Sequence, residues 1–109
     1  MAPISQPTFT PTGGSVIIGG ATNVEITNLS IPLASTEVSH ILQTDLKQLR
    51  IKARNMCNLQ YAFVSGESAT KFWKIHRGCV ENLTDLTFNG VLYIQSDTAS
   101  TIVEIMELY

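Results

Sequence analysis

The chain has 109 residues, which suits one domain, and it carries a formal net charge of −2 with only 15% charged residues, against about 25% in a typical soluble domain. This balance argues against a nucleic-acid-binding surface, because phosphate contacts need clustered Lys and Arg. No apolar run approaches the roughly 20 residues that span a bilayer, so no membrane contact is expected. The N-terminus also lacks the basic region and apolar core of a signal peptide.

The N-terminal segment differs from the rest of the chain in composition. Three prolines interrupt it, two glycine pairs flank a short apolar run, and it has no charged side chain. Prolines favour extended conformations, and paired glycines raise the entropy lost on ordering. Two interpretations stay open: a disordered tail, or an arm that orders by pairing with another subunit through Val16, Ile17 and Ile18. We divide the chain into an N-terminal arm, residues 1–20, and a folded domain, residues 21–109.

Residues 23–33 alternate apolar and polar side chains, which is typical of β-strands. The alternation changes phase near Thr27 and Asn28, which predicts a bulge or a turn between two short strands. Pro32 places its strand at a sheet edge, because proline cannot donate a ladder hydrogen bond. Residues 35–44 are ambiguous, since their apolar spacing also fits one helical turn.

The clearest strand pattern covers residues 46–54, with residues 59–64 as its predicted partner strand after a turn. Apolar side chains face one way, and a row of three cations faces the other: Arg50, Lys52 and Arg54. One interpretation is a solvated face that discourages edge pairing. The other is a docking stripe for an acidic protein surface, where charge fixes register more than it adds affinity.

The next predicted strand, residues 70–75, contains two adjacent aromatic residues, Phe72 and Trp73. Neighbours in a strand point to opposite faces, so one of them is expected in the core and the other at the surface. An exposed aromatic side chain would be an interface anchor or a platform on which a sugar stacks. Further on, Asn89-Gly90 is a strong signal for a two-residue hairpin.

The chain closes with two β-branched and aromatic runs, residues 91–96 and 101–109, which predict an antiparallel hairpin. In the second run, three side chains are expected to face the core and two to face solvent: Val103, Ile105 and Met106, against Glu104 and Glu107. Together the patterns predict an all-β domain, a β-sandwich or jelly roll of about seven or eight short antiparallel strands with an extended N-terminal arm.

Reactive side chains form no convincing constellation in the sequence. Cys57 and Cys79 are expected to be reduced thiols, because no secretory signal accompanies them. His76 lies three residues before Cys79, but structural zinc needs four ligands and a Cys–His nucleophile needs a third group that orients the base. A strand could present Glu104 beside a second carboxylate, yet the nine acidic residues are scattered singly. No catalytic residue, cofactor site or metal site is therefore predicted.

The order of segments resembles the small β-sandwich or jelly-roll virion proteins of tailed bacteriophages, namely capsid decoration or cement proteins and related head or tail accessories. The resemblance covers about residues 23–109, and five segments carry it: LSIPLAST (29–36), LKQLRIKARN (46–55), LQYAFVSG (59–66), KFWKIHRGC (71–79) and VLYIQSDTASTIVEI (91–105). It implies a structural protein of the virion, assembled in the host cytoplasm, that binds the major capsid protein as a homo-oligomer, a dimer or a trimer. The family supplies no active site to transfer.

Two further functions stay open. One is a carbohydrate- or receptor-binding module of a head fibre or tail, in which Trp73 or Tyr93 stacks on a sugar ring. The other is a small hydrolase that uses Glu104 or the pair His76 and Cys79.

Overall fold

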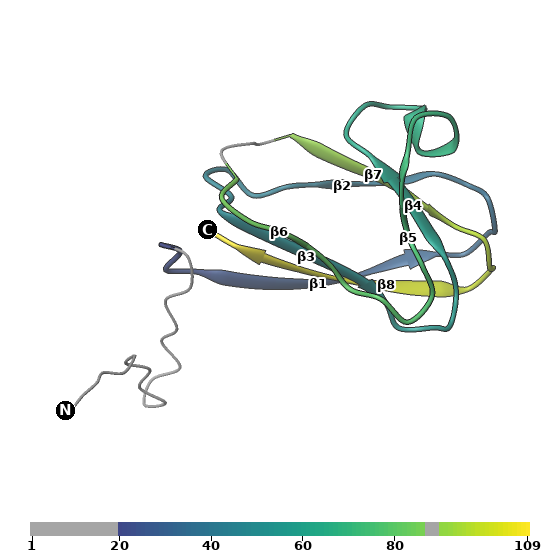
Figure 1. The fold of residues 1–109 in the computed structure, drawn as a ribbon, viewed down its shortest axis with the longest axis horizontal. Coiled ribbons are helices and arrows are strands. Elements are labelled where there is room, and N and C mark those ends of the chain that lie inside the picture. The colour runs from purple at the N-terminus through teal and green to yellow at the C-terminus, as the bar shows by residue number, and fades with distance from the viewer. Residues whose placement is uncertain (1–19, 87–89) are drawn as a thin grey trace.

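A computed structural model describes residues 20–86 and 90–109, and it places them in two antiparallel sheets packed face to face (Figure 1). The strands are β1 (Val24–Ile31), β2 (Val38–Ile41), β3 (Gln48–Ala53), β4 (Leu59–Ala62), β5 (Trp73–Ile75), β6 (Glu81–Leu83), β7 (Val91–Ser96) and β8 (Thr101–Leu108). A single 3₁₀ turn, η2 (Glu67–Ala69), lies between β4 and β5. The predicted all-β sandwich is confirmed, whereas the predicted arm falls almost wholly outside the described residues.

The strand order is that of an eight-stranded jelly roll. One sheet runs β1-β8-β3-β6 and the other β2-β7-β4-β5. The pairs β1 with β8, β2 with β7, β3 with β6 and β4 with β5 are nested within one another. Such nesting arises when one long hairpin is rolled across two layers, the arrangement of double-sheet jelly rolls.

This order corrects three predicted hairpins. β3 and β4 lie in different sheets, and so do β7 and β8. The strands on either side of the Asn89-Gly90 signal, β6 and β7, are likewise in different sheets. The physical reason is that both strands of each pair bury one face in the shared core. Their side-chain pattern is therefore the same whether the chain returns within a sheet or crosses to the facing one. At residues 97–100 the crossing is held by the Thr101 hydroxyl, which donates to the Thr98 carbonyl at 2.7 Å.

Aliphatic side chains from both sheets form the core between the layers. The largest of those that are fully buried are Ile31, Leu46, Leu49, Ile51, Leu59, Leu92, Ile94, Val103, Ile105 and Leu108. Cys57 is also buried, with its Sγ 3.8 Å from the Thr101 hydroxyl, and Cys79 is exposed. Both thiols are free, in agreement with the prediction.

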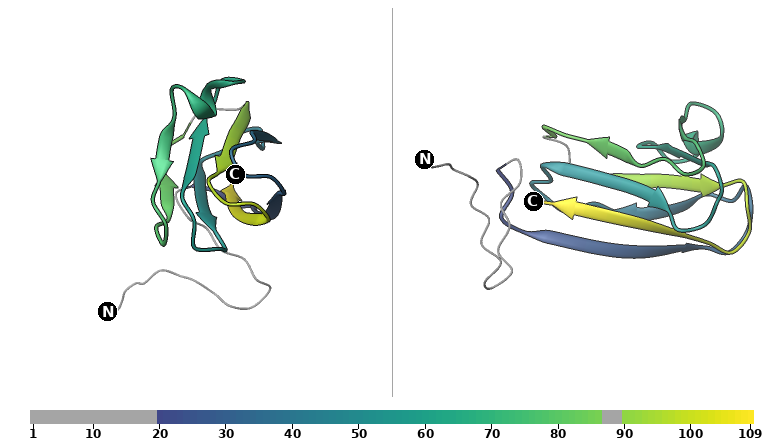
Figure 2. Two further views of the ribbon diagram at one scale, coloured as in Figure 1. Left: turned by 90° about the vertical axis from the view of Figure 1, so that its right-hand side faces the viewer. Right: turned by 60° about the horizontal axis from the view of Figure 1, so that its bottom comes forward.

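Strand β1 runs unbroken through the phase change, so the predicted bulge or turn at Thr27 and Asn28 is wrong. Its register against β8 is continuous over all eight residues. The apparent phase change arises because Ile26 faces outward, opposite Met106, whereas Leu29 and Ile31 face the core. The prediction from Pro32 is confirmed: β1 is an edge strand of its sheet (Figure 2), and Pro32 follows its last residue.

One open assignment is decided and another is corrected. The segment 35–44, left ambiguous by the sequence, contains strand β2 and no helical turn. In β8, Glu107 is fully buried on the core side, whereas Met106 faces outward and is half-buried. The alternation of buried and half-buried positions continues as far as Glu107, which tolerates its inner position because donors surround its carboxylate. Within the described ranges no helix is long and apolar enough to cross a membrane.

Candidate interaction surfaces

The three cations Arg50, Lys52 and Arg54 lie in one row on the outer face of the β1-β8-β3-β6 sheet. Their positions along the chain alternate with Leu49 and Ile51, which are fully buried, so the row points away from the core. The predicted placement of the row on one strand face therefore holds. Its function as a docking stripe or a solvated face depends on what balances the charge.

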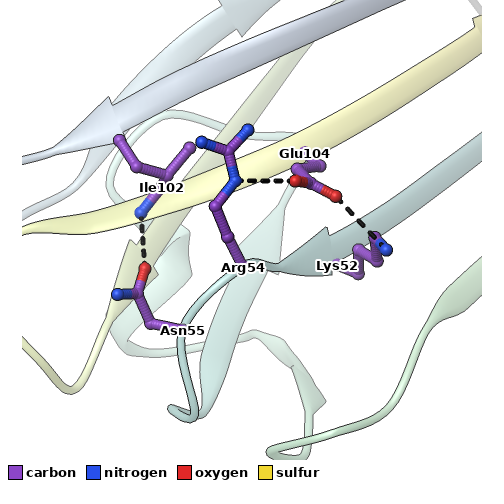
Figure 3. A network of polar contacts seen from close by, with 5 residues as sticks. All are labelled: Lys52, Arg54, Asn55, Ile102 and Glu104. Atoms are coloured by element: carbon purple, nitrogen blue, oxygen red, sulfur yellow. Dashed lines mark hydrogen bonds and ion pairs between the residues drawn. The ribbon is translucent and has the colours of Figure 1, made fainter.

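Glu104 of β8 balances two of these cations (Figure 3). Its carboxylate lies 2.7 Å from Arg54 Nε and 3.2 Å from Lys52 Nζ. The hydrogen bonds from Arg54 and then Lys52 hold the pKa of Glu104 below its ordinary value. Both cations are about half exposed, and ion pairs at such positions contribute little to stability. Glu104 therefore tunes the charge of this face more than it holds the fold together.

Arg50 differs from its two neighbours. It lies opposite Met106 of β8 on one side and Asn82 of β6 on the other, so it has a neighbouring strand on both sides. Its Nε is buried and has no hydrogen-bond partner in the described part of the chain. A buried donor without a partner is costly, and the Arg50 side chain as a whole is half-buried on this face, where a carboxylate or carbonyl group could bind its guanidinium.

A hollow of about 340 Å³ surrounds Arg50, and we call its lining the outer-face patch. The patch combines apolar and charged side chains: Ile26, Arg50, Lys52, Val80, Glu104 and Met106. Ile26 is 60% exposed and Val80 is 56% exposed. Neighbouring exposed aliphatic side chains around an arginine are a common feature of protein interfaces.

Neither the exposure of Ile26 nor that of Val80 is predicted from the sequence, which indicates only a bulge or turn just after Ile26. The one available signal was the phase change in β1, which marks an apolar residue on the polar face.

A second hollow, of about 640 Å³, lies along the open side of the sandwich between β5 and β6. We call it the lateral cleft. Its lining includes Tyr61, Phe72, Trp73 and Glu81. The Tyr61 hydroxyl donates to Glu81 at 2.6 Å, and burial together with this carboxylate raises the pKa of Tyr61 above its ordinary value. The cleft thus has aromatic walls and a fixed carboxylate.

The prediction that one of Phe72 and Trp73 lies in the core is wrong. Phe72 is 37% exposed and Trp73 is 66% exposed. Trp73 is opposite Tyr61 and so is directed to the inner side, but β5 is an edge strand and leaves the indole at the open side of the sandwich. Trp73 therefore belongs to the lateral cleft, away from the cation row. Tyr93 is half-buried on β7, outside the lining of this cleft.

The remaining sequence candidates are not brought together. His76 and Cys79 are exposed on a turn in which the Cys79 amide donates to the His76 carbonyl at 3.0 Å. Glu104 faces cations and not a second carboxylate. Among residues 20–86 and 90–109, no three His, Cys, Asp or Glu side chains gather as a metal-binding group. Val16, Ile17 and Ile18 lie outside the described residues.

Comparison of the chain with protein-family models, with curated proteins and with solved structures finds no match.

Proposed function

We propose that the chain is a structural virion protein, a capsid decoration or cement protein that binds the major capsid protein through the outer-face patch. The observation that carries this proposal is the combination at Arg50 of a buried, unpartnered Nε with exposed aliphatic neighbours. The jelly-roll strand order and the sequence resemblance to phage virion proteins support it. Binding of this kind relies on surface shape and charge, and it needs no reactive group.

The partner surface would offer a carboxylate or carbonyl group to Arg50 and aliphatic contacts to Ile26 and Val80. Removal of one partner from a buried, charge-assisted contact costs more than removal of a rim charge. Weak contacts of this size become strong when a symmetric shell repeats them. A single outer-face patch is therefore expected to bind weakly, and repetition of the contact over the capsid shell supplies the remaining affinity.

The test is cosedimentation of the purified protein with cognate capsid shells that lack it. Arg50→Glu is expected to weaken binding at least about tenfold, because it replaces the unpartnered donor with a repelling acid. Lys74→Glu is the matched control, since Lys74 lies on the outer face of the other sheet, opposite Gln60. Equal binding by wild type and Arg50→Glu, or equal loss in both variants, would contradict the proposal.

The lateral cleft supports the second candidate function, a carbohydrate-binding accessory module. Trp73 offers a flat apolar face, and Glu81 offers an acceptor for sugar hydroxyls. Trp73 is the sole tryptophan of the chain, so its fluorescence reports on this cleft alone. Titration with host cell-surface glycans should shift this emission in a saturable way, and Trp73→Ala should abolish glycan retention on a column. Retention that survives Trp73→Ala would remove this candidate.

A further inference from the structure

Each of the two sheets ends in two edge strands, and these edges differ greatly in length. β1 has eight residues, whereas β6, β2 and β5 have three, four and three. An edge strand presents a row of unpaired backbone amides and carbonyls, which is a template for pairing with another chain. Short edges reduce this risk, so β1 is the edge that needs either protection or a partner.

Strand β1 lacks the usual protective features. Its pairing with β8 contains no bulge, and Pro32 comes only after its last residue. Glu25 is its single charged residue, and it has no lysine. On its outer side Val24 is 44% exposed and Ile26 is 60% exposed. A long, regular edge with exposed aliphatic side chains is the profile of an interface strand.

We propose that β1 pairs antiparallel with β1 of a second copy of this chain. A two-fold axis normal to the sheet would join the two β1-β8-β3-β6 sheets into one continuous sheet of eight strands. The contact is isologous, so each copy satisfies the free edge of the other and the assembly closes as a dimer. This proposal does not depend on shell binding, because it uses only the edge of the sheet and two copies of the chain.

The sequence of β1 suits pairing with itself. Directly opposite residues share a face, so an antiparallel pair must match even-numbered with even-numbered positions. Registers centred on Thr27 or on Asn28 give the longest overlap. In both, Glu25 faces an aliphatic residue of the second copy, either Leu29 or Ile31, and never its own counterpart. Like-charge repulsion across the pair is therefore avoided.

The pairing also covers the exposed aliphatic side chains. In the register centred on Thr27, Ile26 lies diagonal to Ile26 of the second copy, within reach of a side-chain contact on the outer face. Val24 extends this apolar contact toward the start of each strand. The outer-face patches of both copies then lie on one side of the joined sheet, because the axis is normal to it. A dimer would present two Arg50 sites to the same partner surface.

Sedimentation equilibrium of the full chain over a concentration series tests the dimer. Wild type should show reversible dimerisation, and Ile26→Lys should raise the dimer dissociation constant at least about tenfold, because it replaces an apolar side chain beside the paired edge with a cation on each copy. In the register centred on Thr27 the two cations would also lie in diagonal contact. Ile41→Lys is the matched control, since Ile41 is 78% exposed on the edge strand β2. A wild-type monomer at millimolar concentration, or equal weakening by both variants, would overturn the proposal.

Disulfide trapping gives a second test that does not depend on the stability of the lysine variant. In a Cys79→Ser background, Thr27→Cys or Asn28→Cys should form covalent dimers on mild oxidation, and the faster of the two identifies the register. Ser39→Cys, at an exposed position of β2, should remain monomeric. Covalent dimers at Ser39 as abundant as those in β1, or none at either β1 position, would exclude pairing through β1.

Discussion

His40 Nε2 lies 2.8 Å from Glu107 Oε1, and this contact ties the two sheets together because His40 belongs to β2 and Glu107 to β8. The Glu107 side chain is fully buried, and its second oxygen accepts the Gln43 amide at 2.7 Å. A buried carboxylate is tolerated only when donors satisfy it. Here both donors come from the facing layer, so the pair fixes how the layers meet near the C-terminal end of β8.

Replacement of His40 by Ala should destabilise the fold, because it leaves one oxygen of a buried carboxylate without its donor. The expected decrease in the free energy of unfolding is about 2 kcal/mol, the usual cost of losing a hydrogen bond to a charged group. Ser39→Ala, at the exposed neighbouring position, should change it by less than about 0.5 kcal/mol. Urea denaturation at neutral pH measures both. Equal stability of the two variants would show that the contact does not hold the layers.

A second carboxylate, Glu37, predicts a loss of stability in acid. It accepts hydrogen bonds from the Ser68 hydroxyl and from the amides of Gly66 and Ser68, and these lower its pKa from the ordinary 4.5, with the hydroxyl as the largest cause. Because the pKa of Glu37 is lower in the folded state than in the unfolded state, its ionised carboxylate stabilises the fold at every pH above the unfolded-state pKa. That contribution is lost as the pH falls below about 4.5 and through the folded pKa.

The measurement is the free energy of unfolding of wild type and Glu37→Gln at pH 7 and pH 3. Wild type should lose more stability between these values than Glu37→Gln, because the amide cannot be protonated. Glu25→Gln, at an exposed position on β1, should behave as wild type. An identical acid loss in wild type and Glu37→Gln would show that the Ser68 contact does not stabilise the folded chain.

The sequence predicted the row Arg50, Lys52 and Arg54 correctly because a period of two fixes which side chains share a face. It also predicted the two-layer class, since short apolar runs separated by turn residues leave few alternatives. The same periodicity carries no information about which strands become neighbours. Nested pairing therefore could not be read from the local turns. All three hairpins predicted between consecutive strands are wrong, and the consecutive strands that do pair, β4 and β5, carry no predicted pairing.

The interaction surfaces depend on long-range pairing and so were largely out of reach. Trp73 and Glu81 meet in the lateral cleft because β5 and β6 are edges of facing sheets, a relationship absent from the local sequence. Ile26 is an apolar residue on the outer face of its strand, and the change of phase that it causes in the sequence pattern predicts a bulge or turn that the structure does not contain. Glu107 was assigned to solvent because a carboxylate is seldom buried, and only the facing layer reveals its donors. Departures from local rules in this chain thus mark contacts formed by distant segments.

Core packing predicts a clear difference between two isoleucines of β8. Ile105 is fully buried between the layers, whereas Ile102 is half-buried on the outer face, where its amide is held by Asn55 at 3.0 Å (Figure 3). Ile105→Ala should lower the free energy of unfolding by about 3 kcal/mol, and Ile102→Ala by about 1 kcal/mol. Urea titrations of the two variants provide the comparison. Equal losses would mean that β8 does not present alternate faces to core and solvent.

The last prediction concerns the charge of the outer-face patch. Glu104→Gln frees Lys52 and Arg54 from their shared carboxylate and makes this face more positive. If the partner surface is acidic, shell binding should become tighter at low salt and more sensitive to added salt, because exposed charges are screened beyond about 10 Å at 0.1 M ionic strength. Arg54→Gln should shift binding the opposite way. Cosedimentation of both variants with shells at two salt concentrations measures the contribution of this charge to binding. An unchanged affinity in both variants would mean that Arg50 and its aliphatic neighbours make the contact without Lys52 and Arg54.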